Sequence, residues 1–235
     1  MFYWPAMDLF IWGLTGLYLA TLSNNSKELI FVILNGLVFW IIIWRAQYEI
    51  NVNILSEMWD KNLVNVVASP LTIWEWITSL IIVGFIKMII SLSFSAIIAF
   101  IFYQYNIFMF GLQLLPITIG LLLFGWSAGF IVAGFIVRYG IKIQTAAWTG
   151  VALIAPFSAL YYPLSILPNW AQKIALVLPP SHIFEGMRDV LFKGYFPAEK
   201  LFIGFALNIP YLLLSLWFFV FMFNKSKKIG LGRLI

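Results

Sequence analysis

The chain has 235 residues, of which 63% are hydrophobic and only 10% are charged, whereas a soluble domain has roughly 45–50% apolar and about 25% charged residues. So few charges cannot cover the surface of a water-soluble protein of this size, so we expect an integral membrane protein. The net charge of +5 comes from basic residues scattered singly between apolar runs, a pattern that orients a chain in a bilayer and does not indicate nucleic-acid binding.

Six apolar segments approach the length of about 20 residues that a transmembrane helix needs. We place them at residues 5–22, 29–44, 76–103, 108–137, 143–164 and 201–223. They predict an all-α integral membrane protein with one domain over residues 1–235. The second segment is short, and we expect Arg45 at its end to reach the membrane interface. The first lacks the basic start and cleavage site of a signal peptide, so we interpret it as a retained span.

The distribution of Lys and Arg in the loops predicts the orientation. Six spans place both termini on the same side, which then holds eight basic residues against five on the other side. Four of the eight follow Asn224. We therefore expect both termini in the cytoplasm and the chain in the bacterial inner membrane.

The region from Tyr48 to Ala68, between the second and third spans, has a different pattern. Its apolar residues recur at helical spacing, and most of its charged and amide residues fall on the other face. This predicts a cytoplasmic amphipathic helix, which either contacts another subunit or only lies in the headgroup region. Thr72 and Glu75 match a capping box that would open the third span.

Residues 168–200, between the fifth and sixth spans, contain two helical stretches that are each too short to cross a bilayer. They are Asn169–Leu178 and His182–Lys193, separated by Pro179-Pro180. Proline inside a helix loses a hydrogen bond and clashes with the preceding turn. We therefore predict a re-entrant helical hairpin on the outer side, with Ser181 capping its second helix.

Several chemistries are missing from the sequence. It has no cysteine and one histidine, which excludes thiolate sites and a paired-histidine haem site within one chain. It has no P-loop motif, so it cannot bind ATP phosphates in that way. A membrane enzyme would depend on His182, Glu185 and Asp189, which can share one helix face. The alternative, which we favour, is that His182 only starts a helix at the outer interface.

Ion-coupled transport usually needs ionisable residues within the spans. Lys87 is the residue clearly in the middle of one, while Asp8 lies near the start of the first span and is expected to reach cytoplasmic water. A structural alternative pairs Lys87 with Asp8 or a backbone carbonyl. Gly125 and Gly129 form a G-x-x-x-G pair, which predicts close helix packing within the chain or in a dimer.

Two stretches together resemble the ABC-2-type transporter permeases. Glu57 to Leu71 (EMWDKNLVNVVASPL) resembles the acidic amphipathic stretch of that family, which ends in Ser-Pro-Leu. Leu167 to Trp170, followed by Leu178 to Arg188, is similar to the signature before the family's last span. The resemblance covers nearly the whole chain, although many members begin with a cytoplasmic amphipathic helix and here Met1 is followed at once by the first span.

The resemblance implies the permease subunit of an ATP-driven exporter that moves an amphiphilic or polymeric substrate. It implies a homodimer of permease chains and two copies of an ATPase subunit, which bind the ATP and Mg²⁺; no cofactor is expected in this chain. Family members export polysaccharides, lipids, drugs or peptides, so the cargo stays open. An ion-coupled carrier and a membrane enzyme remain as alternatives.

The resemblance also assigns three sets of residues. The coupling helix that docks on the ATPase would use Glu57, Trp59, Asp60, Lys61 and Asn62. The outer hairpin would close the path with Pro179, Pro180, Glu185 and Arg188. The first, second and fifth spans would line the path, with Trp12, Trp40 and Tyr161 as the expected lining residues.

Overall fold

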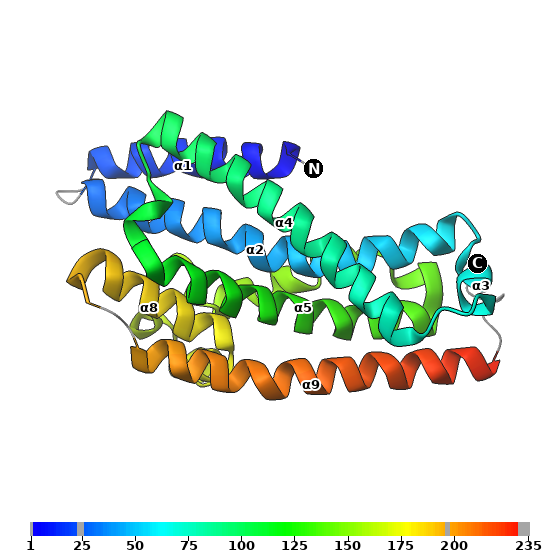
Figure 1. The fold of residues 1–235 in the computed structure, drawn as a ribbon. Coiled ribbons are helices and arrows are strands. Elements are labelled where there is room, and N and C mark those ends of the chain that lie inside the picture. The colour runs from blue at the N-terminus through cyan, green and yellow to red at the C-terminus, as the bar shows by residue number, and fades with distance from the viewer. Residues whose placement is uncertain (1, 23–25, 196–197, 230–235) are drawn as a thin grey trace.

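The computed structural model describes residues 2–22, 26–195 and 198–229, and within these ranges the protein is helical without strands. Five helices among the described residues are long and apolar enough to cross a membrane. They are α1 Tyr3–Leu22, α2 Ser26–Trp59, α4 Ile73–Tyr103, α5 Leu114–Tyr139 and α9 Ala198–Ile229. Helices α1, α2, α5 and α9 run roughly side by side, and α4 crosses them obliquely (Figure 1). The predicted helical fold is therefore confirmed, and it is compatible with a multi-pass membrane protein.

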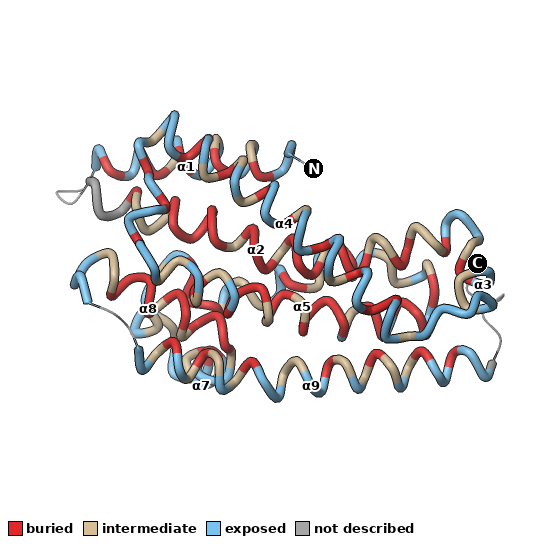
Figure 2. Tube along the Cα trace, in the orientation of Figure 1, coloured by how far each residue is buried: buried red, intermediate tan, exposed pale blue. Residues whose placement is uncertain are grey.

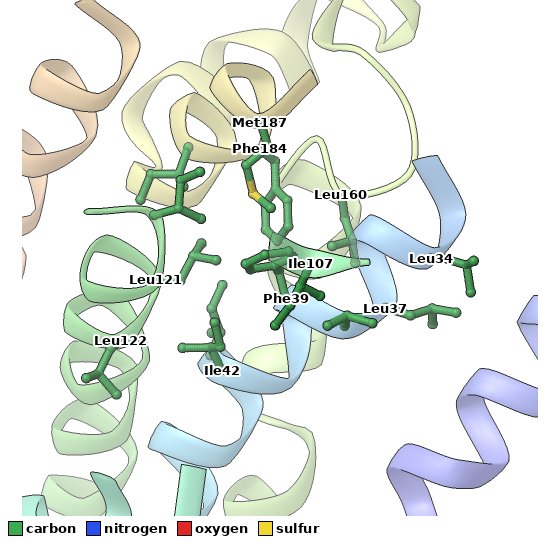
Figure 3. Packing of buried hydrophobic residues seen from close by; sticks show 14 of the residues in the cluster. Leu34, Leu37, Phe39, Ile42, Ile107, Leu121, Leu122, Leu160, Phe184 and Met187 are labelled. Carbon is green, nitrogen blue, oxygen red and sulfur yellow. The ribbon is translucent and has the colours of Figure 1, made fainter. Parts of the chain in front are cut away.

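The centre of the bundle is formed by α2 and α5. Figure 2 shows buried residues concentrated along these two helices, with exposed residues along the outer faces of α1, α4 and α9. Side chains from α2, α5 and the neighbouring α8 meet in one apolar cluster, which includes Phe39, Leu121 and Phe184 (Figure 3). A helix that is apolar on all sides packs inside a bundle, as the buried residues of α2 show.

The two central helices pack closely because of Gly125. A Cβ atom on Gly125 would lie 2.6 Å from the Cβ of Ala46 and 2.8 Å from the carbonyl oxygen of Ile43. Small residues let helix backbones approach in this way. The structure thus places the G-x-x-x-G pair at a contact within the chain, between α2 and α5.

The predicted end of the second span is corrected by the structure. Helix α2 continues past Arg45 to Trp59, so residues 48–59 belong to α2 and not to a separate amphipathic helix. A turn at residues 60–62 leads to the short α3, Leu63–Ala68. Arg45 is buried and pairs with Glu49 on the same helix, with 3.1 Å between Nη1 and Oε1. Its charge is therefore paired inside the bundle.

The predicted fifth span, residues 143–164, is not one long helix. After α5 the chain forms a series of short elements: η2 Gly140–Ile143, α6 Thr145–Thr149, η3 Val151–Leu153, η4 Ala155–Phe157 and η5 Leu164–Ile166. Pro156 lies in this series, and its ring removes a backbone donor that a continuous helix would use. The long apolar composition was correctly identified, but its helical continuity was not.

This irregular segment nevertheless follows α2 in the antiparallel direction. The Trp148 ring stacks on Trp59, Gln47 Nε2 donates to the Ala147 carbonyl at 2.9 Å, and Tyr161 contacts Gly36. These contacts extend along α2 for about 35 Å at 1.5 Å per residue, similar to the hydrocarbon core of about 30 Å. The contacting residues of the segment itself, Trp148 to Tyr161, are 13 positions apart, about 26 Å at the 3₁₀ rise of about 2 Å per residue, so the stacked side chains of Trp59 and Trp148 cover part of the length along α2.

The capping box that was expected before the third span is present. The backbone N–H of Thr72 donates to Glu75 Oε2 at 2.7 Å, and the N–H of Glu75 donates to Thr72 Oγ1 at 3.3 Å. Before α4, Ser69 and Pro70 end α3. After α4, η1 Ile107–Gln113 leads into α5. The third span therefore begins where the local sequence signal places it.

The predicted outer hairpin contains α7, Asn169–Val177, and α8, Pro179–Lys193, with the break at Leu178. Pro179 and Pro180 form the first turn of α8 and not the linker, since proline is tolerated where a helix N–H has no partner. Ser181 does not cap α8 as expected. Its hydroxyl instead donates to the carbonyl oxygens of Ala175 and of Leu178, the latter at 2.7 Å, and so closes the end of α7.

Candidate functional site

A cavity of about 450 Å³ lies between α1, α2 and the irregular segment at residues 148–161. We call it the aromatic cavity because five tryptophans, one tyrosine and one carboxylate line it: Trp4, Trp12, Trp40, Trp44, Trp148, Tyr161 and Asp8. The structure thus brings together all three side chains that the sequence suggested for a path, namely Trp12, Trp40 and Tyr161. Their part in transport stays a prediction.

The aromatic cavity lies near the middle of α2. Its α2 residues run from Leu37 to Trp44, and Ile41 is about 22 Å from the start of α2 and about 27 Å from its end at 1.5 Å per residue. Helix α1 begins part-way along α2 (Figure 1), so that Trp4 shares the cavity with Trp44. Helix α2 is longer than a bilayer core, which is about 30 Å thick. The cavity lies far from both ends of this helix.

Asp8 therefore lies beside the middle of α2, and its access to cytoplasmic water stays a prediction. The sequence shows where α1 begins but not how far along α2 it begins. Among the described residues, Asp8 makes no hydrogen bond or ion pair. Its carboxylate is exposed on the cavity wall.

A second cavity of about 570 Å³ adjoins the first and has almost entirely apolar walls. We call it the outer cavity, since it extends to Arg188 and Phe192 of α8. The two cavities share Trp12 and Tyr161, whose rings stack with centroids 6.4 Å apart and an interplanar angle of 25°. The stacked pair thus lies at the boundary between the two cavities.

The outer hairpin holds the backbone on both sides of Tyr161. Arg188 Nη2 donates to the carbonyl of Ala159, and the backbone N–H of Leu164 donates to Glu185 Oε1 at 3.0 Å. Arg188 Nη1 and Glu185 Oε1 pair at 2.7 Å. Ala159 has φ of 53°, in the left-handed region that costs a non-glycine residue energy. Two of the four predicted hairpin residues therefore position the segment that carries Tyr161, while Pro179 and Pro180 are buried at the start of α8.

Asp189 joins α8 to the start of α9. Its carboxylate pairs with Lys193 at 2.8 Å and with Lys200 at 2.5 Å. Burial alone would raise the pKa of Asp189, but hydrogen bonds from Lys193, Lys200 and Tyr195 outweigh it and lower the pKa below its ordinary value. Asp189 is therefore a charged contact between the hairpin and the last long helix.

The three residues considered for an enzyme have separate partners. His182 Nε2 lies 2.8 Å from the carbonyl oxygen of Leu176 in α7. Glu185 binds Arg188 and the Leu164 N–H, and Asp189 binds two lysines. Within the described residues, no contact joins His182 to either carboxylate, so each side chain has a role in connecting elements of the fold.

A buried charge cluster that the sequence analysis missed lies between α2 and α4. Glu49 pairs with Arg45 at 3.1 Å and with Lys87 at 2.7 Å, and Arg45 Nε donates to Ser91 Oγ at 2.9 Å. Lys87 therefore pairs with Glu49 and not with Asp8 or a backbone carbonyl. The i, i+4 spacing of Arg45 and Glu49 is typical of an ion pair on one helix. The predicted second span ended at residue 44, before both residues, so this signal was not used.

The predicted coupling residues lie at the turn between α2 and α3, at the right end of Figure 1. Asn62 Nδ2 donates to Glu57 Oε2 at 2.6 Å, which closes the turn, and Lys61 has φ of 55°. Asp60 and Lys61 are exposed at its tip. We call residues 57–62 the inner turn.

Trp59 points away from this hydrogen bond. Its ring stacks on Trp148 with centroids 6.3 Å apart, and its indole N–H donates to Gln144 Oε1 at 3.3 Å. Trp148 also lines the aromatic cavity. Trp59 therefore connects the inner turn, which we name after its predicted side, to the cavity wall.

A scan against protein-family models finds none that matches this chain, and a search of curated proteins finds no significant match.

Proposed function

We propose that this chain is the membrane-spanning permease subunit of an ATP-driven exporter of the ABC-2 type. The observation that carries the proposal is the aromatic cavity, which three separate segments build near the middle of the bundle. Secondary transporters bind their substrates near the middle of the bilayer, between parts that move relative to each other, and we propose that this chain does the same although its energy comes from ATP. The resemblance of the inner turn and the outer hairpin to ABC-2 permeases supports the choice of this class.

In this proposal the energy comes from a partner. Two permease chains would assemble with two ATPase subunits, which bind ATP and Mg²⁺ and dock at the inner turn on the cytoplasmic side. Both termini would be cytoplasmic, and the irregular segment at residues 143–164 would form the sixth crossing in the inner membrane. Its contacts along α2, over a length close to a bilayer core, support that crossing.

The contacts suggest how movement would reach the cavity. Closure of the ATPase subunits would push the inner turn, and packed elements transmit such a push as a rigid-body shift. The stack of Trp59 on Trp148 connects the turn directly to the cavity wall. At the other end, Glu185 and Arg188 hold the segment of Tyr161. A substrate would then pass from the aromatic cavity to the outer cavity when the Trp12–Tyr161 pair separates.

Docking is tested by purifying the chain together with ABC ATPase subunits from the same organism. We expect co-purification with the native chain and its loss in Asp60→Lys, because Asp60 is exposed at the tip of the inner turn. The matched control is Glu199→Lys, which changes an exposed acid in the first turn of α9, at the opposite end of the bundle. Co-purification that is equal in both variants would contradict docking at the inner turn.

The buried charge cluster favours a second candidate function, an ion-coupled secondary carrier. Ionisable residues inside membrane segments mark ion pathways in many transporters, and Arg45, Glu49 and Lys87 form such a group. Transport by the chain alone in proteoliposomes, driven by a proton or sodium gradient without any ATPase, would favour this candidate. Transport that needs ATP and the second subunit would exclude it.

A further inference from the structure

We infer that the aromatic cavity binds a lipophilic organic cation, with Asp8 as its counter-ion and the indole rings around it. The cargo class of the exporter rests on the proposed function, whereas the binding itself is a property of this chain. The chemical class meant is a quaternary ammonium or phosphonium ion with apolar substituents.

The charge of the cavity is the first argument. Asp8 is the charged residue of its lining, and among the described residues it has no basic partner. An ionised carboxylate inside a membrane is costly without a counter-charge. A bound cation supplies that charge, while a neutral or anionic molecule leaves the carboxylate uncompensated or adds repulsion.

The aromatic lining is the second argument. Tryptophan has the most favourable ring face for a cation, and aromatic cages are the recurrent way in which proteins bind quaternary ammonium groups. Five indoles and the phenol of Tyr161 line the cavity together with Asp8. The indole N–H groups are donors only, so Asp8 and the Tyr161 hydroxyl are the side-chain acceptors that a polar neutral molecule would find. A cation without N–H groups needs no hydrogen-bond acceptor.

The positions of the neighbouring cations agree with this assignment. Arg188 lines the outer cavity and not the aromatic cavity. Arg45 packs on the Trp44 ring with its Cζ atom 5.7 Å from the ring centroid, and it pairs with Glu49 in the buried charge cluster. Both guanidinium groups are thus held by carboxylates of their own, and Asp8 remains for a ligand.

The size of the cavity is the third argument. Its volume of about 450 Å³ lies within the range of about 300–1,000 Å³ that is typical of sites for drug-sized molecules. It is one end of a longer space, because the outer cavity continues beyond the Trp12–Tyr161 pair. A compact cation with several apolar groups fits the first cavity, and its apolar groups suit the walls of the second.

The test uses the purified full chain in lipid nanodiscs and radiolabelled tetraphenylphosphonium as the probe. We expect saturable binding, a loss of affinity of about tenfold or more in Asp8→Asn, as for removal of a charge-assisted contact, and partial recovery in Asp8→Glu. Glu199→Gln is the matched control, since it removes an exposed carboxylate outside the cavity, in the first turn of α9. It should bind the probe as the native chain does.

Tetraphenylborate, which has nearly the same shape and the opposite charge, gives a second measurement that needs no variant. Weak or undetectable binding of tetraphenylborate to the native chain supports the inference. Equal binding of the two ions, or tetraphenylphosphonium binding that Asp8→Asn leaves unchanged, would overturn it. Saturable cation binding in a chain that never docks an ATPase would remove the proposed function and leave the cation site in place.

Discussion

Replacing Arg188 by methionine should loosen the outer hairpin from the segment that carries Tyr161. The guanidinium makes charge-assisted hydrogen bonds to Glu185 and to the carbonyl of Ala159. Hydrogen bonds to charged groups contribute about 1.5–3 kcal/mol each. Methionine keeps much of the apolar volume of the side chain, so the change isolates the polar contacts.

The partners that Glu185 keeps limit the expected loss of stability. After the substitution Glu185 still has Lys200 Nζ at 3.6 Å and the Leu164 N–H at 3.0 Å, so its carboxylate is not left without partners. We therefore take the lower end of the range and expect a loss of about 3 kcal/mol in the free energy of unfolding. For a chain of this length that lowers the melting temperature by about 6–12 °C.

The assay is thermal unfolding in detergent, followed by the fraction that stays monodisperse on size exclusion. Lys173→Met is the control, since Lys173 is exposed on the adjacent α7. In addition, Arg188→Met combined with Glu185→Gln should lose less stability than the sum of the single variants, because the two residues share one interaction. Additive losses, or a melting temperature equal to that of Lys173→Met, would refute the role assigned to this pair.

Four further outcomes follow from particular contacts. Gly125→Ala should lower the free energy of unfolding by about 1–3 kcal/mol in the same thermal assay, because its Cβ would meet the α2 backbone at 2.8 Å; an unchanged melting temperature would show that α2 and α5 can separate freely. Ala159→Gly should change it by less than about 1 kcal/mol, since glycine relieves the φ of 53° and adds chain entropy; a large loss would argue against the left-handed backbone. Glu49→Gln should destabilise by about 3–5 kcal/mol in denaturant titration, as it leaves the buried Arg45 unpaired, and native-like stability would exclude that pairing. The pKa of Asp189 is lowered from its ordinary value of 3.8, so its contribution to stability is complete above that value and is lost as pH falls through the lowered pKa. The stability difference between native and Asp189→Asn proteins should therefore stay constant above about pH 5 and shrink only below about pH 4; a difference that shrinks already above about pH 5, or that does not shrink at lower pH, would contradict this.

Features that depend on one turn of chain were predictable from the sequence. The capping box of Thr72 and Glu75 and the break between α7 and α8 at Leu178 involve residues only a few positions apart. Such signals act through local backbone geometry, so they hold whatever packs around them. The apolar composition of the spans was equally local.

Features that depend on distant partners were not predictable. Arg45 ends a hydrophobic run in the sequence, but its partner Ser91 lies 46 residues away, and Glu49 meets Lys87 38 residues away. These contacts let α2 continue through its charges. The same reason applies to residues 143–164, where apolar composition fits a long helix or a series of short turns along α2.

The candidate site was predicted in part. The resemblance to ABC-2 permeases suggested Trp12, Trp40 and Tyr161, and these side chains line one cavity. Asp8 and Trp148 were missed because their positions depend on where α1 begins along α2 and on how the irregular segment follows α2. The sequence contains no local signal for the position of α1 or of the irregular segment along α2.

Thiol labelling at the inner turn tests the central proposal most directly, because the chain contains no cysteine and single-cysteine variants need no other change. Lys61→Cys should react with a membrane-impermeant maleimide in inside-out vesicles and not in intact cells, and added ATPase subunit should slow the reaction strongly. Lys173→Cys on α7 should show the opposite sidedness and no effect of the ATPase subunit. Labelling of Lys61→Cys from outside the cell, or labelling at the same rate with and without the ATPase subunit, would contradict a permease driven through its inner turn.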